Sequence, residues 1–443
     1  MKPRLGYGLT IGLLASLGLL GWVPRATAAE PGNNSKENLF HLEAPVPDTG
    51  LDFHGAVQLD YYGFEPNEHY LSGAGPQENT FSIRRARVVL TGVLYEKLTF
   101  FIQSGLESTD TLLMDAIVIY APASWVDFRA GQMKMPFSGE RLESYLINPF
   151  EERSLAANLE LRRSRGVAAA LHPGKGGVRL DLGWFTGENM MKNNTDDDFE
   201  GVMRGAVRLD KLIGSFPGAL SLAGSAARGR RAPDNSATTS FTGKTQNELV
   251  FFSPVNVNGY RTRYEADLSW SYKPLWIAGE WIRSMEERNG VSVDLDTDGD
   301  GVKEVTVIRR LKPLLEEGWK ASVVCVLTGE DYNPRLAPKH KWGALELAGR
   351  YSMVTFDSRE GRIPAGGGAF GREVSAASTA LGRRSIDESV RAADAELNWF
   401  LKPGFWIALD TTWQWFDHSS PYLPKAPDDH DDVNYRARVG VAF

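Results

Sequence analysis

Three observations predict an all-β fold, a transmembrane antiparallel β-barrel. Strand-like segments follow one another from Leu51 to the end of the chain, with turn residues between them. Their apolar and polar residues alternate, as expected for a sheet with lipid on one face and water on the other. The mean hydropathy is −0.29, and beyond the amino terminus no apolar run is long enough for a spanning helix. A barrel dilutes its membrane signal in this way because every second strand residue faces water.

The last stretch of the chain, 433–443, shows this alternation clearly. One phase is apolar and ends on the carboxy-terminal aromatic Phe443, while the other phase carries Arg436 and Arg438. We interpret the stretch as the strand that closes the barrel, and its terminal aromatic as the signal read by the barrel-insertion machinery. An edge strand of a soluble antiparallel sheet also alternates, so this strand alone leaves both interpretations open.

The remaining segments support the barrel because their number is even, as bacterial barrels require. Interfacial Trp and Tyr on the apolar phases favour a membrane, and charges on the other phases predict a wet interior, because a charge on the lipid face would cost about 2–4 kcal/mol. Short connections such as 96–97 and 273–274 alternate with long ones, which we assign to the extracellular side. The sixteen predicted strands are 51–64, 79–95, 98–107, 111–122, 125–137, 162–173, 178–187, 199–211, 218–230, 259–274, 275–290, 317–330, 342–357, 388–402, 405–416 and 433–443.

The amino terminus predicts export. Residues 1–28 have the cationic start, apolar centre and Ala26-Thr27-Ala28 cleavage site of a signal peptide, although the long apolar run also fits an uncleaved anchor. Residues 29–50 read as a flexible periplasmic segment, and 51–443 as one barrel domain. The chain carries a net charge of −7, and the signal peptide three cations and no acid, so the mature protein would be near −10. The single cysteine, Cys325, excludes an intrachain disulfide.

Several motifs in the barrel segments resemble those of one known family. They are 81–87 (FSIRRAR), 131–138 (GQMKMPFS), 151–154 (EERS), 327–330 (LTGE) and 342–352 (WGALELAGRYS). Together they resemble the phosphate-selective porins O and P of bacterial outer membranes, in order over most of 51–443. The resemblance implies a trimeric 16-stranded barrel with an inward constriction loop and arginines lining the pore. It is less specific for phosphate, because members of the family need not share one solute.

Many cations lie on the polar phases of the strands, where a fork of guanidinium donors could pass an anion from site to site. Arg85 and Arg87 share such a face, and we expect both to sit in water; Arg84 lies on the opposite phase, near the membrane interface. Alternatively, lumen arginines pair with lumen acids and only hold the barrel in shape. The predicted pore-lining and anion-binding residues are Arg85, Arg87, Lys134, Arg153, Arg162, Arg163, Arg165, Arg204, Arg208, Arg261, Arg263, Arg350, Arg436 and Arg438.

The segment 138–161 departs from strand periodicity and is rich in charge. If it folds inward, its acids Glu140, Glu143, Glu151 and Glu152 would face wall arginines and filter the path. The alternative is a solvated outer loop.

A second loop contains a calcium-like motif. Asp296, Asp298 and Asp300, followed by Gly301 and then Glu304, have the spacing of a calcium loop, but Val307 stands where an EF-hand has its bidentate Glu. The flanking Val-rich stretches look like the arms of an extended hairpin, so the loop is either a calcium site or only an acidic tip.

No hydrolase, zinc-protease or phosphate-loop motif is present, so we expect no enzyme, although a barrel hydrolase stays an alternative. The leading hypothesis is a passive outer-membrane channel for small anions, with phosphate or polyphosphate as solute and no nucleic-acid partner. The alternatives are a general or weakly cation-preferring porin, favoured by the acidic mature charge, and a structural or adhesive barrel blocked by its loops. We expect no cofactor apart from calcium in the extracellular loop.

Overall fold

The computed structural model describes most of the predicted barrel. The described residues are 41–43, 50–64, 79–95, 97–107, 112–146, 148–174, 176–187, 198–231, 240–245, 250–257, 259–295, 305–333, 336–357, 387–416 and 431–443. The predicted signal peptide and most of 29–50 lie outside them. No helix within the described residues has the length and apolar character needed to cross a membrane.

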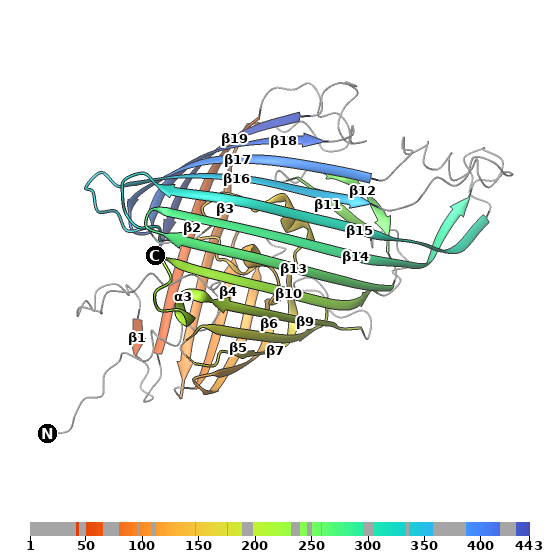
Figure 1. Ribbon diagram of the computed structural model, residues 1–443, viewed down its shortest axis with the longest axis horizontal. Coiled ribbons are helices and arrows are strands. Elements are labelled where there is room, and N and C mark those ends of the chain that lie inside the picture. The colour runs from red at the N-terminus through yellow and green to blue at the C-terminus, as the bar shows by residue number, and fades with distance from the viewer. Residues whose placement is uncertain are drawn as a thin grey trace.

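Sixteen strands in this part of the chain form one closed antiparallel barrel, each pairing with the next and the last with the first (Figure 1). Every predicted strand is confirmed, with shifts at the ends. The strands are β2 (Gly50–Phe64), β3 (Thr80–Leu94), β4 (Leu98–Gly105), β5 (Leu113–Ala123), β6 (Val126–Lys134), β7 (Arg163–Leu171), β8 (Val178–Phe185), β9 (Glu200–Arg208), β10 (Ala219–Arg231), β13 (Gly259–Tyr272), β14 (Leu275–Leu295), β15 (Val305–Val326), β16 (Ala344–Asp357), β17 (Asp387–Lys402), β18 (Phe405–Phe416) and β19 (Asp431–Ala442).

The barrel closes where β19 pairs with β2. Beyond the strand, the Phe443 amide donates to the Gly55 carbonyl at 3.0 Å, and the Gly55 amide donates back at 2.9 Å. A Cβ on residue 55 would lie 2.4 Å from the Phe443 ring, so only glycine admits that ring. The carboxy-terminal aromatic therefore packs directly on the closing seam.

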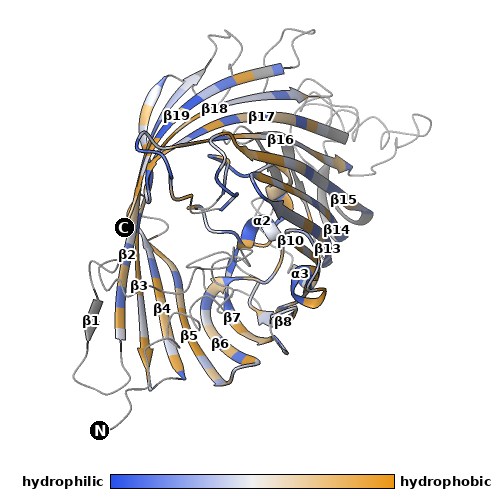
Figure 2. Cartoon of the chain, turned by 60° about the vertical axis from the view of Figure 1, so that its left-hand side comes forward, coloured by the Kyte–Doolittle hydropathy of each residue, from blue (hydrophilic) through white to orange (hydrophobic). Residues whose placement is uncertain are grey.

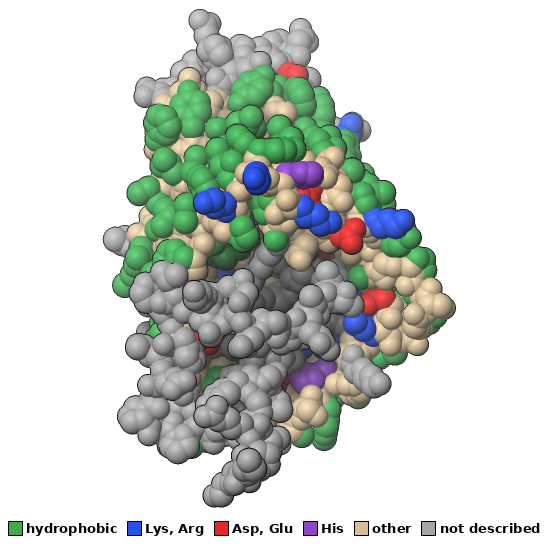
Figure 3. All heavy atoms as spheres, turned by 90° about the vertical axis from the view of Figure 1, so that its left-hand side faces the viewer, with side chains coloured by type: hydrophobic (Ala, Val, Ile, Leu, Met, Phe, Trp, Pro, Cys, Tyr) green, Lys and Arg blue, Asp and Glu red, His purple; other side chains and the backbone are tan. Residues whose placement is uncertain are grey.

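The two faces of the wall divide as the alternation predicts. Tyr435 and Val439 are 48% and 42% exposed on the outside, whereas Arg436 is 3% exposed on the inside. On the face shown in Figure 3, hydrophobic side chains cover much of the described surface, and charged ones gather near its middle. The outer surface suits lipid because it leaves few charges to desolvate.

Some elements differ from the sequence expectation. The predicted strand 199–211 stops at Arg208, and a helical turn, α3 (Leu209–Leu212), follows. The Val-rich arms of the acidic loop do extend β14 and β15 into a long hairpin, with Val293 opposite Val307. Three short strands were not predicted: β1 (His41–Glu43), which pairs with β2, and the hairpin of β11 (Ser240–Lys244) and β12 (Val250–Asn256).

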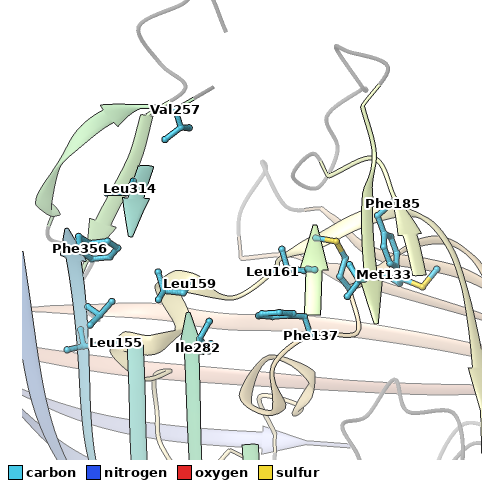
Figure 4. Close-up of a cluster of buried hydrophobic side chains, with 14 of the residues drawn as sticks. Met133, Phe137, Leu155, Leu159, Leu161, Phe185, Val257, Ile282, Leu314 and Phe356 are labelled. Atoms are coloured by element: carbon cyan, nitrogen blue, oxygen red, sulfur yellow. The ribbon is translucent and has the colours of Figure 1, made fainter. Parts of the chain in front are cut away.

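Residues 135–162, here called the inner segment, connect β6 to β7 and carry the helical turns α2 (Gly139–Leu142) and η2 (Leu155–Leu159). Leu155 and Leu159 share a buried cluster with Phe356 of the β16 wall, and at the other end Phe137 packs in the same cluster (Figure 4). Gly318 of β15 makes room for η2, because a Cβ there would lie 3.1 Å from the Ala156 Cα atom. The inner segment therefore packs against the inward faces of the strands, and α2 is seen within their ring in Figure 2.

This packing limits the predicted wet interior to part of the barrel. Val354 and Phe356 continue the inward phase that carries Arg350 and Ser352, yet both are fully buried. η2 rests on a buried apolar part of the inner wall, because the inward-facing residues of β16 change from polar to apolar along the strand. An alternation pattern reports which side a residue faces, not whether water reaches it.

Candidate functional site

The inner segment is anchored by acids that meet wall cations. At its start, Ser138 caps α2 by accepting from the Arg141 amide at 3.0 Å, and its hydroxyl donates to Glu160 at 2.8 Å. The buried Glu140 accepts from the Ser154 amide at 2.9 Å and lies 3.1 Å from Lys320 and 3.3 Å from Arg350. Burial opposes its ionisation, but Lys320 and Arg350 lower the pKa of Glu140 to about 2.

The second anchor is the Glu151–Glu152 pair. The Glu151 amide donates to Glu396 of β17 at 2.7 Å, and its carbonyl accepts from Arg438 of β19 at 3.1 Å. Burial raises the pKa of the Glu151 carboxyl to about 8, against the lowering effect of Arg438 and Arg436; Asp60 and Asp410 raise it further. For Glu152 the balance is reversed: burial would raise its pKa, but Arg85 and Arg84 hold it well below the ordinary value.

The position of Arg84 differs from the predicted one, which was near the membrane interface. Its guanidinium forms a two-bond pair with Glu152, at 2.5 and 2.9 Å. The reason is a β-bulge: Gln58 pairs with Arg85 and Leu59 with Ile83, so Arg84 has no partner on β2. The extra residue breaks the alternation. The Arg84 side chain therefore reaches the inner segment, although its position in the sequence belongs to the apolar phase of the strand.

Arg85 and Arg87 also differ from expectation, because neither sits in water. Their side chains are 11% and 14% exposed, and both guanidinium groups lie over the ring of Tyr145, at 5.7 and 4.4 Å from its centre. Arg85 donates to Gln58 at 2.8 Å, and Arg87 to Glu107 at 3.1 Å. Both arginines therefore have packing partners inside the barrel.

Most other predicted wall arginines do face inward, and each lies beside an acid. This arrangement is the one expected if lumen arginines pair with lumen acids and hold the barrel in shape. The pairs are Arg163 with Asp115 (2.8 Å), Arg204 with Asp267 (2.5 Å), Arg208 with Asp210 (2.6 Å), Arg261 with Glu200 (2.8 Å), Arg263 with Glu286 (3.9 Å), Arg350 with Asp394 (2.8 Å), Arg436 with Asp410 (3.4 Å) and Arg438 with Asp60 (2.6 Å).

Among the described residues of β6 and the inner segment, three half-buried cations have no acid within hydrogen-bond distance, and we call Lys134, Arg141 and Arg153 the cationic cluster. The Lys134 ammonium donates only to the carbonyls of Leu142 and Glu143 within the described residues, at 3.2 and 2.8 Å. Arg153 donates to the Arg141 carbonyl at 3.5 Å, and Arg141 lies 4.0 Å from Glu160. Burial holds the pKa of Arg141 well below its ordinary value, and the neighbouring Arg153 lowers it further.

Two other predicted cations, at the junction of the inner segment and β7, do not belong to the cationic cluster. Arg162 is exposed, while Arg165 is half-buried opposite Gln132. Glu143 lines the same cavity as Lys134, and burial raises its pKa to about 7. That cavity, of about 80 Å³, is bounded by the inner segment and by β6–β10 and β13–β15.

Sequence reasoning missed several charged residues of the site. Arg129 and Arg179 point inward and share Asp181, and Lys320 is the counter-ion of Glu140. Each lies on the polar phase of a strand that was predicted, so alternation could have identified them. The predicted calcium ligands Asp296, Asp298, Asp300 and Glu304 lie outside the described residues, and that site stays a prediction.

A closed barrel with an apolar outside, a charged inside and a packed inner segment defines a channel of the outer membrane. The sequence matches the family model of the phosphate-selective porins O and P over residues 52–409. The chain belongs to this family, which together with the fold indicates a channel rather than an enzyme. None of the curated protein sequences matches the chain.

Solved structures share the fold at low sequence identity. An anion-selective porin from Comamonas acidovorans has a TM-score of 0.54 and 10% identity, with 89% of this chain and all of that one covered. The outer membrane protein OmpT of Vibrio cholerae, in its trimer form, gives 0.51 and 10%, with 89% and 99% covered. The outer membrane channel DcaP of Acinetobacter baumannii gives 0.50 and 10%, with 91% and 100% covered.

Proposed function

We propose that this protein is a passive diffusion channel for small anions, with phosphate the solute that the family suggests. The observation that carries the proposal is the cationic cluster. Lys134, Arg141 and Arg153 lie together where the inner segment crosses the lumen, and a passing anion would relieve their mutual repulsion. The paired wall arginines are nearly neutral as pairs and contribute less to the field.

In this proposal the inner segment is the constriction loop. Glu140 and Glu151 anchor it at two points, and its apolar side rests on the buried apolar wall, so solutes pass along its charged side. The long connections face the cell exterior, and the short turns face the periplasm. We further propose a homotrimer, which is supported by the family and by the trimer form of the OmpT structure with the same fold.

Reversal potentials across a salt gradient test the proposal. Replacing Lys134 and Arg153 together with Gln should move the reversal potential toward cations and weaken the block of chloride current by phosphate. The matched control is Arg283→Gln with a second exposed substitution, Lys211→Gln, because both side chains are exposed in the described structure. Equal shifts in cluster and control variants, or no shift in either, would refute anion selection by the cluster.

One observation favours a second candidate, a general or weakly cation-preferring porin. Nearly every wall arginine in the described structure has a neighbouring carboxylate, and the chain is acidic overall, with a net charge of −7. The same experiment separates the two, because a general channel would give a reversal potential near zero in the unmodified protein.

A further inference from the structure

Three buried carboxyl groups meet where the inner segment touches the wall. Glu140 and Glu160 belong to the inner segment, and Glu280 belongs to β14. One carboxylate oxygen from each lies within 4.8 Å of the other two. Their side chains are at most 2% exposed, so water does not screen them.

Two of the carboxyl groups have an oxygen with no hydrogen-bond partner. These atoms are Oε2 of Glu160 and Oε1 of Glu280, and each exposes less than 1 Å². The other oxygens are used: Glu160 accepts from Ser138, and Glu280 accepts from the Glu140 amide at 3.0 Å. A buried carboxylate oxygen without a donor is costly, so the site calls for a further cation or proton.

The cations already present leave the cluster short of positive charge. Lys320 lies 3.1 Å from Glu140 and 3.6 Å from Glu280, and it balances one carboxylate. Arg350 reaches Glu140 at 3.3 Å but is shared with Asp394, while Arg141 stays 4.0 Å from Glu160, beyond hydrogen-bond distance. With Lys320 alone counted, the three carboxylates keep two negative charges. Arg350 and Arg141 offset part of that charge from 3.3 and 4.0 Å, but neither gives the two orphan oxygens a hydrogen bond, and a divalent ion would contact those oxygens directly.

We propose that Glu140, Glu160 and Glu280 bind one hard divalent cation, such as Ca²⁺, that fastens the inner segment to β14. Carboxylate oxygens are the ligands that such ions prefer, and oxygens within 4.8 Å can share one ion. The site is distinct from the predicted loop at 296–304, and it does not depend on the channel preferring anions.

Calorimetric titration of the chelator-treated, folded barrel with Ca²⁺ tests the site. The background protein carries Asp298→Asn and Asp300→Asn, which removes the predicted loop site from the signal. We expect one binding event that weakens at least tenfold in Glu280→Gln, whose amide oxygen can still accept from the Glu140 amide. The control is Glu346→Gln, which removes another buried wall carboxyl, bonded to Asn398, and should bind as the background does.

The outcomes are separable. If Glu280→Gln does not fold, as judged by heat-modifiable migration, Glu160→Gln takes its place and should show the same loss. Absence of Ca²⁺ binding in the background protein refutes the proposal. Binding that is equal in background and Glu280→Gln refutes it as well.

Discussion

Replacing Glu140 with Gln should release the inner segment from the wall. Glu140 holds four groups: the amide and hydroxyl of Ser154, the guanidinium of Arg350 and the ammonium of Lys320. Gln keeps an acceptor for the Ser154 amide but loses the charge that Lys320 and Arg350 contact. Those two cations retain Glu280 and Asp394, so the loss is partial.

The magnitude follows from the bonds that are weakened. Hydrogen bonds to charged groups contribute about 1.5–3 kcal/mol each, and breaking a buried ion pair costs about 3–5 kcal/mol. We expect about 3 kcal/mol less docking free energy, which is about a hundredfold rise in the released fraction at 1.4 kcal/mol per tenfold. The barrel itself should persist, because its ladder of backbone bonds is unchanged.

Trypsin cleavage of the folded barrel measures this fraction, because cleavage tracks the open population when opening is fast. Arg141 and Arg153 are the reporter sites, both half-buried when the segment is docked. Asp181→Asn is the control: it removes a lumen acid that pairs with Arg179 on the wall. Cleavage at Arg141 that rises no more than in this control would show that Glu140 does not hold the segment.

Three further predictions concern other parts of the barrel. Deleting Phe443 should reduce outer-membrane yield and heat-modifiable folding, since the residue packs on the Gly55 seam as well as ending the last strand; normal values for both would contradict this. Replacing Arg85 and Arg87 with Gln should lower anion preference and, because both lie over Tyr145, also lower the thermal midpoint by several degrees; unchanged reversal potential and phosphate block would make both arginines structural. Raising the pH should loosen the inner segment at Glu151: its docked pKa near 8 exceeds the ordinary value of 4.5, so docking binds a proton and weakens as pH rises through about 8. Channel noise between pH 6 and 9 measures this, and Glu151→Gln should abolish the dependence; noise that is flat across this range in the unmodified protein would count against it.

The strands could be predicted from the sequence because lipid imposes a strict period of two. A residue such as Tyr435 must face out and Arg436 must face in, whatever their neighbours are. The positions at which prediction failed break this period or do not depend on it. Arg84 sits in a bulge, and η2 rests on the apolar end of an inward-facing phase. The alternation pattern predicts that such inward-facing residues contact water.

The candidate site could be predicted less well, because it depends on which charges meet. The sequence identifies an arginine on the polar phase but not the acid beside it, which is often far along the chain, as Asp60 is from Arg438. The sequence pattern also did not identify Arg141 as a candidate anion ligand, because α2 does not follow the period of two that marks a strand. Pairing of this kind is a property of the closed barrel and not of any one strand.

Distance explains why the cationic cluster and the net charge of −7 on the chain need not conflict. An anion about 4 Å from an unpaired ammonium gains about 1 kcal/mol even at the dielectric constant of water, and about 4 kcal/mol at an effective value of 20. A charge on the outer surface, more than a Debye length of about 8 Å away, is largely screened. Arg204 lies against Asp267 and Glu265, so a passing ion meets a set of opposite charges there, whereas Lys134 is bonded to backbone carbonyls and to no carboxylate within the described structure. The sign of selectivity should therefore follow Lys134 and its two neighbours rather than the total charge of the protein.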